Sequence, residues 1–336
     1  MTELNVSWRP ILGGGAWSIH IFPHRTFTIS GLPIKEEHLP FLAVACSMNV
    51  ILGQDEYMHV KINSEKPLPS SFIPLCDQIM KVSNGKFAMT LVNTAPLTWP
   101  TKNGDSILLD SGGKDSRYLV EELNIDEIMF IKGAGIAGEY RTELDGVLSR
   151  HPREHVNIVE FDSWDYTSIG LKFKNRSRWK AFVSIILAAV LGDTVCIGIN
   201  HDPRLIDGKN LAEGDLLRYF PDSPVTLSLL AELLVIDIVI SPPESYCYFR
   251  SIEMNWNTRS CFSPDVLCEP NNDFSRSCGK CRTLLIYDKI SGNLELTEYE
   301  NAFFMGEEWM GDSVSEIKKN YGMRDTIISP IIFYGK

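Results

Sequence analysis

The sequence has 336 residues, 44% hydrophobic and 22% charged, a composition typical of a globular protein with one large or two moderate domains. Its 32 Lys and Arg against 43 Asp and Glu residues give a net charge of −11, which argues against broad electrostatic binding to nucleic acid. Without an evident signal peptide or a run long enough to span a bilayer, the chain is expected to be cytoplasmic, with thiols or metal-bound cysteines rather than disulfides.

Residues 1–103 are expected to form a small β-rich N-terminal domain. The segments 16–22 (AWSIHIF) and 25–30 (RTFTIS) are rich in aromatic and β-branched residues, and 57–63 (YMHVKIN) alternates in polarity. Residues 36–52 could contain one short helix, and Gly and Pro separate these segments.

From residue 104 the pattern changes to alternating strands and helices. Such a pattern predicts an α/β domain with a doubly wound parallel sheet over residues 104–336. Ligands of these sheets bind beyond the carboxyl ends of the strands, so the residues that follow the strands are the candidate site. The predicted strands are 106–110, 127–133, 157–162, 194–200 and 236–242, and the predicted helices are 117–124, 179–192 and 225–234.

The turn SGGKDS between the first of these strands and its helix predicts a phosphate-binding loop. Its glycines permit φ > 0 and close backbone approach, and the N–H groups of the first helical turn point at an anion. The serines add hydroxyl donors, the lysine adds a positive charge, and the aspartate fits a residue that holds the loop or a Mg²⁺ ion between phosphates. An ordinary surface turn before a helix is the alternative. The six residues are Ser111, Gly112, Gly113, Lys114, Asp115 and Ser116.

Four cysteines gather in a polar, Pro- and Asn-rich stretch at 261–281, which predicts a tetrahedral structural zinc site. Cys278 and Cys281 have the Cys-x-x-Cys spacing that points two thiolates at one ion, and Cys261 and Cys268 complete the set. A redox Cys-x-x-Cys pair with two bystanders, or ordinary thiols, is the alternative. The remaining cysteines lie in apolar or aromatic settings and are expected to be buried: Cys46, Cys76, Cys196 and Cys247.

The SGGKDS turn resembles the SGGxDS signature of the PP-loop ATP pyrophosphatases. Together with the later cysteine cluster, it resembles the QueC-like (7-cyano-7-deazaguanine synthase) family over residues 104–285. The resemblance implies a PP-loop (HUP-like) fold that splits ATP between its α and β phosphates, with ATP, Mg²⁺ and Zn²⁺ as cofactors. The loop would hold the departing pyrophosphate, with Lys114 and Asp115 taking part in catalysis.

Further stretches extend the resemblance to the substrate site. The segment 174–200 brings the family's arginine onto Arg176, which could stabilise charge on the phosphate oxygens during adenylation. His201 and Asp202 fall on an acidic substrate-pocket segment, and Asp222 falls on the aspartate of a Tyr-Pro-Asp segment. A carboxylate accepts well from the neighbouring N–H donors of a guanine-like edge, so the two aspartates are the candidates for binding a deazaguanine. A helix cap or a solvated charge is the alternative for each aspartate, and a turn cap is the alternative for the histidine.

The family resemblance implies an ATP-dependent C–N ligase that adenylates 7-carboxy-7-deazaguanine, or a similar deazapurine, and then forms an amide or nitrile. The amine would come from ammonia or from a partner protein recognised by residues 1–103, because QueC-like proteins also occur beside extra domains in bacterial anti-phage (CBASS-like) operons. Ser177 and Pro224 depart from family residues, so a nucleotide- or deazaguanine-binding sensor or scaffold is the alternative. We expect no membrane partner, and a homodimer stays open.

Two other PP-loop classes fit the sequence less well. A tRNA-modifying enzyme would need a basic face, and the net charge of −11 argues against one. An asparagine-synthetase-like amidotransferase would open with a nucleophilic cysteine, whereas residue 2 is Thr2.

Overall fold

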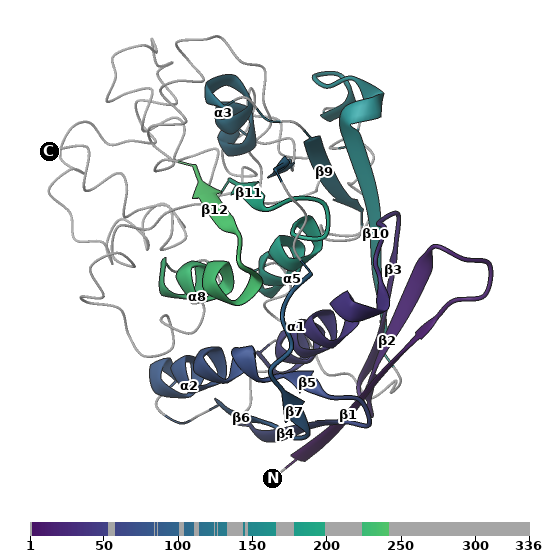
Figure 1. Ribbon diagram of the computed structural model, residues 1–336, viewed down its shortest axis with the longest axis vertical. Helices are drawn as coiled ribbons and strands as arrows, with labels where there is room; N and C mark the ends of the chain where they lie inside the picture. The colour runs from purple at the N-terminus through teal and green to yellow at the C-terminus, as the bar shows by residue number, and fades with distance from the viewer. Residues whose placement is uncertain are drawn as a thin grey trace, which may run out of the picture. The chain divides into compact units, whose positions relative to one another are not determined.

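The computed structural model describes residues 2–52, 58–83, 85, 87–100, 104–110, 114–123, 125, 127–132, 144, 147–165, 178–198 and 224–241 (Figure 1). The chain divides into two compact units. The first comprises Met1–Ser111, Leu123–Ile197 and Gly208–Ile240, and it holds all the described strands. In the second, the described residues are those of helix α3 (Lys114–Glu122), Gly198 and Ser241.

The first unit is built on a sheet with the strand order β12-β11-β8-β9-β10-β3-β2-β1-β4-β6. A two-stranded sheet pairs β5 (Leu68–Pro69) with β7 (Thr94–Ala95). The strands of the large sheet are β1 (Thr2–Pro10), β2 (Ala16–Phe22), β3 (Arg25–Ser30), β4 (Met58–Ser64), β6 (Phe87–Leu91), β8 (Ser106–Leu109), β9 (Glu127–Lys132), β10 (Val156–Asp165), β11 (Thr194–Ile197) and β12 (Asp237–Ile240).

The strands that follow residue 104 are parallel to one another. β8 lies between β9 and β11, β10 lies beyond β9, and β12 lies beyond β11. Counted from β8 in chain order, the arrangement is 3-2-1-4-5, which is compatible with a Rossmann-like fold. The predicted α/β class with a large, mostly parallel sheet is therefore confirmed.

The burial of the strands explains their different sequence patterns. Ile128, Met129 and Phe130 are consecutive buried residues of β9, as expected for a strand covered on both faces. In β1, by contrast, Leu4 and Val6 are buried while their neighbours are exposed, so that this strand packs one face on the core.

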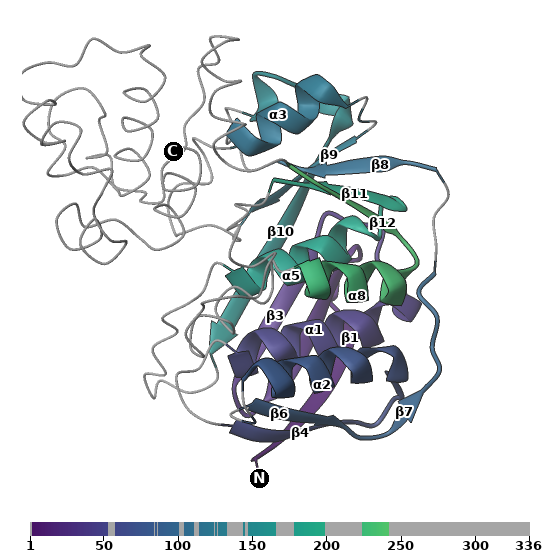
Figure 2. The same cartoon turned by 90° about the vertical axis from the view of Figure 1, so that its left-hand side faces the viewer.

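Four helices of the first unit pack in two pairs. They are α1 (Leu39–Leu52), α2 (Ile73–Val82), α5 (Arg178–Ala188) and α8 (Pro224–Leu234). α1 contacts β1, β2 and β4, α5 contacts β8 and β11, and the two helices contact each other. α2 likewise contacts both β6 and α8. In Figure 2 the four helices lie between β8, β11 and β12 on one side and β4 and β6 on the other. None of the helices within the described ranges is long and apolar enough to cross a membrane.

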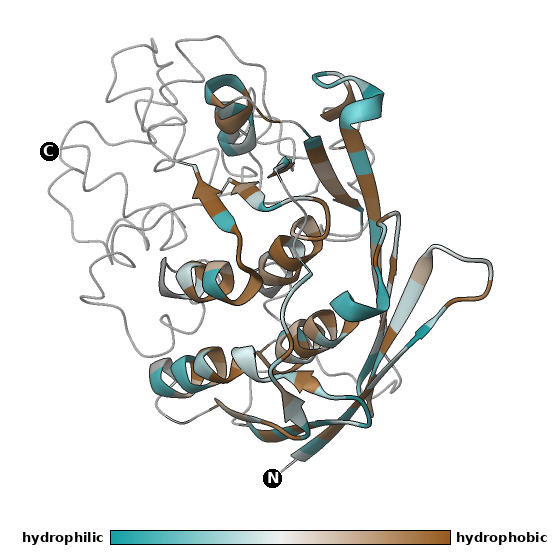
Figure 3. Ribbon diagram, viewed as in Figure 1, coloured by the Kyte–Doolittle hydropathy of each residue, from teal (hydrophilic) through white to brown (hydrophobic). Residues whose placement is uncertain are grey.

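Helix α1 is buried on all sides. Every residue of Leu39–Leu52 except Asn49 is buried, and most of the helix is apolar, as the largely brown ribbon in Figure 3 shows. A helix with this pattern belongs in the centre of a core rather than at a surface. The sequence predicted one short helix within 36–52; the observed helix has 14 residues, preceded by the 3₁₀ turn η1 (Glu36–His38).

Trp99 connects the segment before residue 100 to the later helices. Its ring is 3% exposed and packs against Phe41 with the ring centroids 5.2 Å apart and nearly perpendicular planes. The Trp99 Nε1–H group donates a hydrogen bond to the carbonyl oxygen of Ala189, just beyond α5, at 3.3 Å. A large aromatic ring in this position joins α1 to the end of α5 through both apolar and polar contacts.

The predicted strands and helices after residue 104 are all observed within a few residues of their predicted limits, as are those at 16–22, 25–30 and 57–63. The elements that had not been predicted include β1, α2 and β6 and the short strands β5 and β7. The boundary at residue 103 stays a prediction. β3 precedes this boundary and β10 follows it, and the two strands are hydrogen-bonded neighbours. They pair antiparallel, with Ser30 opposite Glu160 at one end and Arg25 opposite Asp165 at the other.

Gly31 permits the close approach of the chain after β3 to β10. Its φ is +85°, and a Cβ atom at this position would lie 2.3 Å from the carbonyl oxygen of Ile158. We predict that Gly31→Ala lowers the free energy of unfolding by about 2–4 kcal/mol, because the methyl group adds a steric clash to left-handed backbone strain.

Gly14→Ala is the matched control, because Gly14 has a φ of +83° and a Cβ atom added there would meet nothing within 4 Å. Its free energy of unfolding should fall by about 1 kcal/mol, from backbone strain alone. Chemical denaturation of both variants measures the difference, and equal losses would contradict the importance of the contact with β10.

Candidate functional site

The candidate site begins at the boundary between β8 and β11. These strands are parallel neighbours, with Leu108 opposite Cys196 and Leu109 opposite Ile197. β9 flanks β8 and β12 flanks β11, so the chain proceeds in opposite directions along the sheet from the two strands (Figure 2). Open α/β sheets bind ligands beyond the carboxyl ends of the strands at such a switch point. The residues that follow Leu109 and Ile197 are therefore the first candidates.

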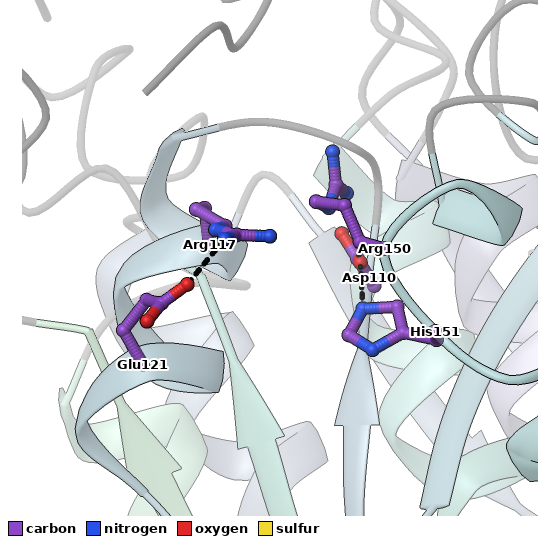
Figure 4. A network of polar contacts seen from close by, with 5 residues as sticks. All are labelled: Asp110, Arg117, Glu121, Arg150 and His151. Atoms are coloured by element: carbon purple, nitrogen blue, oxygen red, sulfur yellow. Dashed lines mark hydrogen bonds and ion pairs between the residues drawn. The ribbon is translucent and has the colours of Figure 1, made fainter. Parts of the chain in front are cut away.

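The predicted helix after the SGGKDS turn is confirmed. α3 begins at Lys114 and ends at Glu122, so that Asp115 and Ser116 lie in its first turn. Ser116 is 2% exposed and Asp115 is partly buried. Further along the helix, an ion pair joins Arg117 to Glu121 one turn later (Figure 4). The first turn of a helix presents backbone N–H groups and the positive end of the helix dipole, an arrangement that favours an anion.

Gly198 lies against the start of α3. A Cβ atom at Gly198 would be 3.0 Å from the Cβ atom of Asp115 and 3.0 Å from the backbone nitrogen of Ser116. A larger residue would therefore push on the first helical turn. Sequence reasoning did not identify Gly198, although its position directly after a predicted strand, in TVCIG, was the available signal.

Asp110, the residue directly after β8, is the centre of a buried polar cluster. Its side chain is 0% exposed, and its Oδ2 atom lies 3.0 Å from Nη2 of Arg150 and 3.2 Å from Nε2 of His151. Figure 4 shows both side chains directed at the carboxylate. An ionised carboxylate only accepts hydrogen bonds, so Arg150 donates to it, and His151 donates in the tautomer that carries the hydrogen on Nε2.

Both partners of Asp110 come from the end of one helical turn. The backbone N–H groups of Arg150 and His151 donate to the carbonyl oxygen of Val147, at 3.0 and 3.1 Å. The Arg150 and His151 side chains are 13% and 8% exposed, so the cluster is largely removed from water. Sequence reasoning missed all three residues. An aspartate directly before the glycine turn was the one local signal.

The other predicted site residues lie outside the described residues. They are Ser111, Gly112 and Gly113 of the turn, Arg176, His201, Asp202, Asp222, and the cysteines Cys261, Cys268, Cys278 and Cys281. The backbone of Lys114 is described as the first residue of α3, but its side chain is not. Within the described ranges, no three His, Cys, Asp or Glu side chains are grouped so that they could hold a metal ion.

The predicted burial of isolated cysteines is confirmed for Cys46, Cys76 and Cys196, while Cys247 lies outside the described residues. Cys196 is on β11, next to the switch point. Burial raises its pKa to about 11, and burial also raises the pKa of Cys76 to about 12. Both are therefore expected to be protonated thiols at neutral pH.

Comparison with protein-family models, with curated proteins and with solved structures gives no match to this chain. The chemistry of the site therefore follows from its own residues. In the second unit, the first turn of α3 can bind an anion. In the first unit, a buried charged cluster holds Asp110, the residue after β8.

We predict that Gly198→Ala weakens the binding of magnesium pyrophosphate about tenfold, which corresponds to about 1.4 kcal/mol. The added methyl group would displace the first turn of α3, whose N–H groups would otherwise face the anion. Isothermal titration calorimetry measures the affinity, and thermal unfolding measures the stability of the same samples.

Gly192→Ala is the control for general destabilisation. Its Cβ atom would lie 2.2 Å from the carbonyl oxygen of Asp105, at the amino-terminal side of β11. This variant should lose stability while keeping its affinity for pyrophosphate. An unchanged affinity in Gly198→Ala, with the wild-type protein binding pyrophosphate, would refute the role of Gly198.

Proposed function

We propose that the protein is an ATP-dependent C–N ligase that adenylates the carboxylate of 7-carboxy-7-deazaguanine or a similar deazapurine. The observation that carries the proposal is the SGGKDS sequence at residues 111–116, which begins two residues after the end of β8, a strand that borders the switch point of the sheet, and runs into the first turn of α3. This order of strand, glycine turn and helix suits polyphosphate. The choice of a deazaguanine comes from the resemblance to the QueC-like family.

The reaction would proceed in two displacements. A carboxylate oxygen of the substrate attacks the α-phosphorus of ATP, the bond to the bridging oxygen breaks, and pyrophosphate leaves. An amine nitrogen then attacks the acyl carbon, AMP leaves, and the nitrogen loses a proton to give an amide. A nitrile would require a second adenylation, on the amide oxygen. In both steps negative charge grows on phosphate oxygens, where fixed donors and cations lower the barrier.

The predicted site residues would divide these tasks. Backbone N–H groups from Ser111 to Ser116, with Lys114, would hold the departing pyrophosphate, and Asp115 would hold Mg²⁺ against the phosphates. Arg176 would stabilise the α-phosphate charge. Asp202 and Asp222 would accept from the guanine-like edge, and His201 is the candidate to take the proton of the amine.

The amine acceptor is either ammonia or an amine on a partner protein. For a protein acceptor, residues 1–103 would be the recognition region, in keeping with the extra domains of QueC-like proteins in anti-phage operons. A sensor or scaffold that binds a nucleotide or a deazaguanine without chemistry is the competing function. Departures from the family at Ser177 and Pro224 are the observations in its favour.

We predict that the protein releases AMP and pyrophosphate from MgATP when 7-carboxy-7-deazaguanine is present. Asp115→Ala should lower kcat/KM at least about 100-fold, which corresponds to about 2.7 kcal/mol of lost transition-state stabilisation. Glu122→Ala is the matched control, because this exposed acid lies at the opposite end of the same helix and should keep activity.

The outcomes of this assay separate the candidate functions. Release of AMP that needs the deazaguanine supports the adenylating enzyme and its substrate. Release of AMP without an amide on ammonia or on any amine tested would argue against the ligase. A folded, zinc-containing protein that binds ATP and releases no AMP would favour the sensor or scaffold.

We predict one zinc ion per chain, bound by the four cysteines at 261–281. Cys278→Ala should lose the zinc, because the remaining thiolates no longer complete a tetrahedral site. Cys76→Ala is the control, since Cys76 is a buried thiol on α2 and should leave the zinc content unchanged. Elemental analysis of the purified full-length chains measures both, and equal zinc contents would show that these cysteines are not the ligands.

A further inference from the structure

We propose that Asp110 is a positioning residue for the phosphate loop, and that its buried contacts with Arg150 and His151 fix the point at which the chain leaves β8. The inference rests on the proposed function, because it concerns the site where ATP would bind. Nothing in the family resemblance assigns a role to these three residues; they are recognised here from the geometry of the first unit.

Asp110 is held by its backbone as well as by its side chain. Its backbone N–H group donates to the carbonyl oxygen of Met129 on β9 at 3.1 Å, so the ladder between β8 and β9 continues one residue past β8. Its carboxylate is fixed from another direction by Arg150 and His151. The next residue in the chain, Ser111, is the first of the SGGKDS turn. The turn therefore starts from a residue with fixed position and direction.

Stability alone is a weak reason for this cluster. Replacing a buried ion pair by apolar side chains of similar volume is often neutral or stabilising, because both charges must be removed from water. Within the described part of the chain, Nε of Arg150 is buried and has no hydrogen-bond partner, so the cluster does not satisfy all its own donors. The charged groups instead fix the orientation of the Asp110 side chain, since a carboxylate that accepts from two fixed donors has little rotational freedom.

The position and orientation of the binding groups matter at a site that transfers a nucleotidyl group. A misplacement of about 1 Å at such a site can reduce catalysis by about 100-fold. Loss of the Asp110 contacts should therefore weaken ATP binding even when the fold survives. A purely structural role predicts another result, because a partly unfolded sample has fewer active molecules and an unchanged KM. The KM for ATP thus distinguishes the two roles.

The test compares full-length variants in stability, in the KM and Kd for MgATP, and in kcat. Asp110→Asn should be less stable than wild type and should raise the KM and Kd for ATP at least about tenfold. The triple variant Asp110→Val, Arg150→Met, His151→Leu replaces the cluster by apolar side chains. It should regain stability relative to Asp110→Asn and keep the weakened binding of ATP.

Glu160→Gln is the matched control. Glu160 pairs with Lys132 at 2.7 Å across β9 and β10, and its side chain is 51% exposed. Removing a carboxylate charge there should leave both stability and ATP binding unchanged, since exposed ion pairs contribute little. If the triple variant does not fold, Asp110→Glu distinguishes the positioning role from a purely structural one. This variant keeps the charge but moves the carboxylate by one methylene group, and it should also raise the KM and Kd for ATP.

The failures of the inference and of the proposed function are distinguishable. If wild-type protein binds ATP, and the folded triple variant or Asp110→Glu binds it equally well, Asp110 is only a structural residue. If wild-type protein neither binds nor consumes ATP, the proposed function fails, and the positioning role fails with it. Weaker ATP binding in a variant of wild-type stability supports both the positioning role of Asp110 and the proposed function.

Discussion

The parallel pairing of β8 with β11 is the interaction on which the functional interpretation depends. It places the first and fourth strands of the α/β region side by side, while the second and the fifth lie outside them. In open α/β sheets, ligands bind beyond the carboxyl ends of the strands at such a switch point. Two residues with special geometry follow these ends in the chain. Asp110 is held in a buried charged cluster, and a Cβ atom at Gly198 would lie only 3.0 Å from the first turn of α3.

Apolar packing joins the strands before residue 100 to those after residue 104. Helix α1 has no polar face to turn toward water, so it requires cover on every side. The strands β1, β2 and β4 cover part of it, and α5 covers another part. α5 in turn packs on β8 and β11. The segment that precedes the α/β pattern therefore contributes to the same core that supports the candidate site.

Sequence periodicity was sufficient for the α/β class and for most strands, because short apolar runs such as Ile107–Leu109 carry a strong local signal. It was less informative where apolar residues are continuous. Residues 36–52 show little helical periodicity because every face of α1 is buried, so the length of the helix was underestimated.

In the candidate site, too, the sequence predicted one part and missed another. The start of α3 within SGGKDS was predictable because glycine, serine and aspartate have local preferences at helix starts. The Asp110 cluster was not, since its partners are 40 and 41 residues away in the chain and meet only in the folded sheet. The tight contact of Gly198 likewise involves a helix that is distant in the sequence.

The pairing of β3 with β10 has a consequence for synthesis on the ribosome. β3 needs a neighbour on the edge that faces β10, yet residues 31–155 must be made before β10 emerges. At ordinary rates of translation this interval lasts on the order of ten seconds. During that time β1, β2 and β3 can pair locally as a meander, while the outer edge of β3 and the apolar surface of α1 await the later strands and α5. The nascent chain is thus most exposed to aggregation midway through its synthesis, and the completion of β10 and α5 ends that interval.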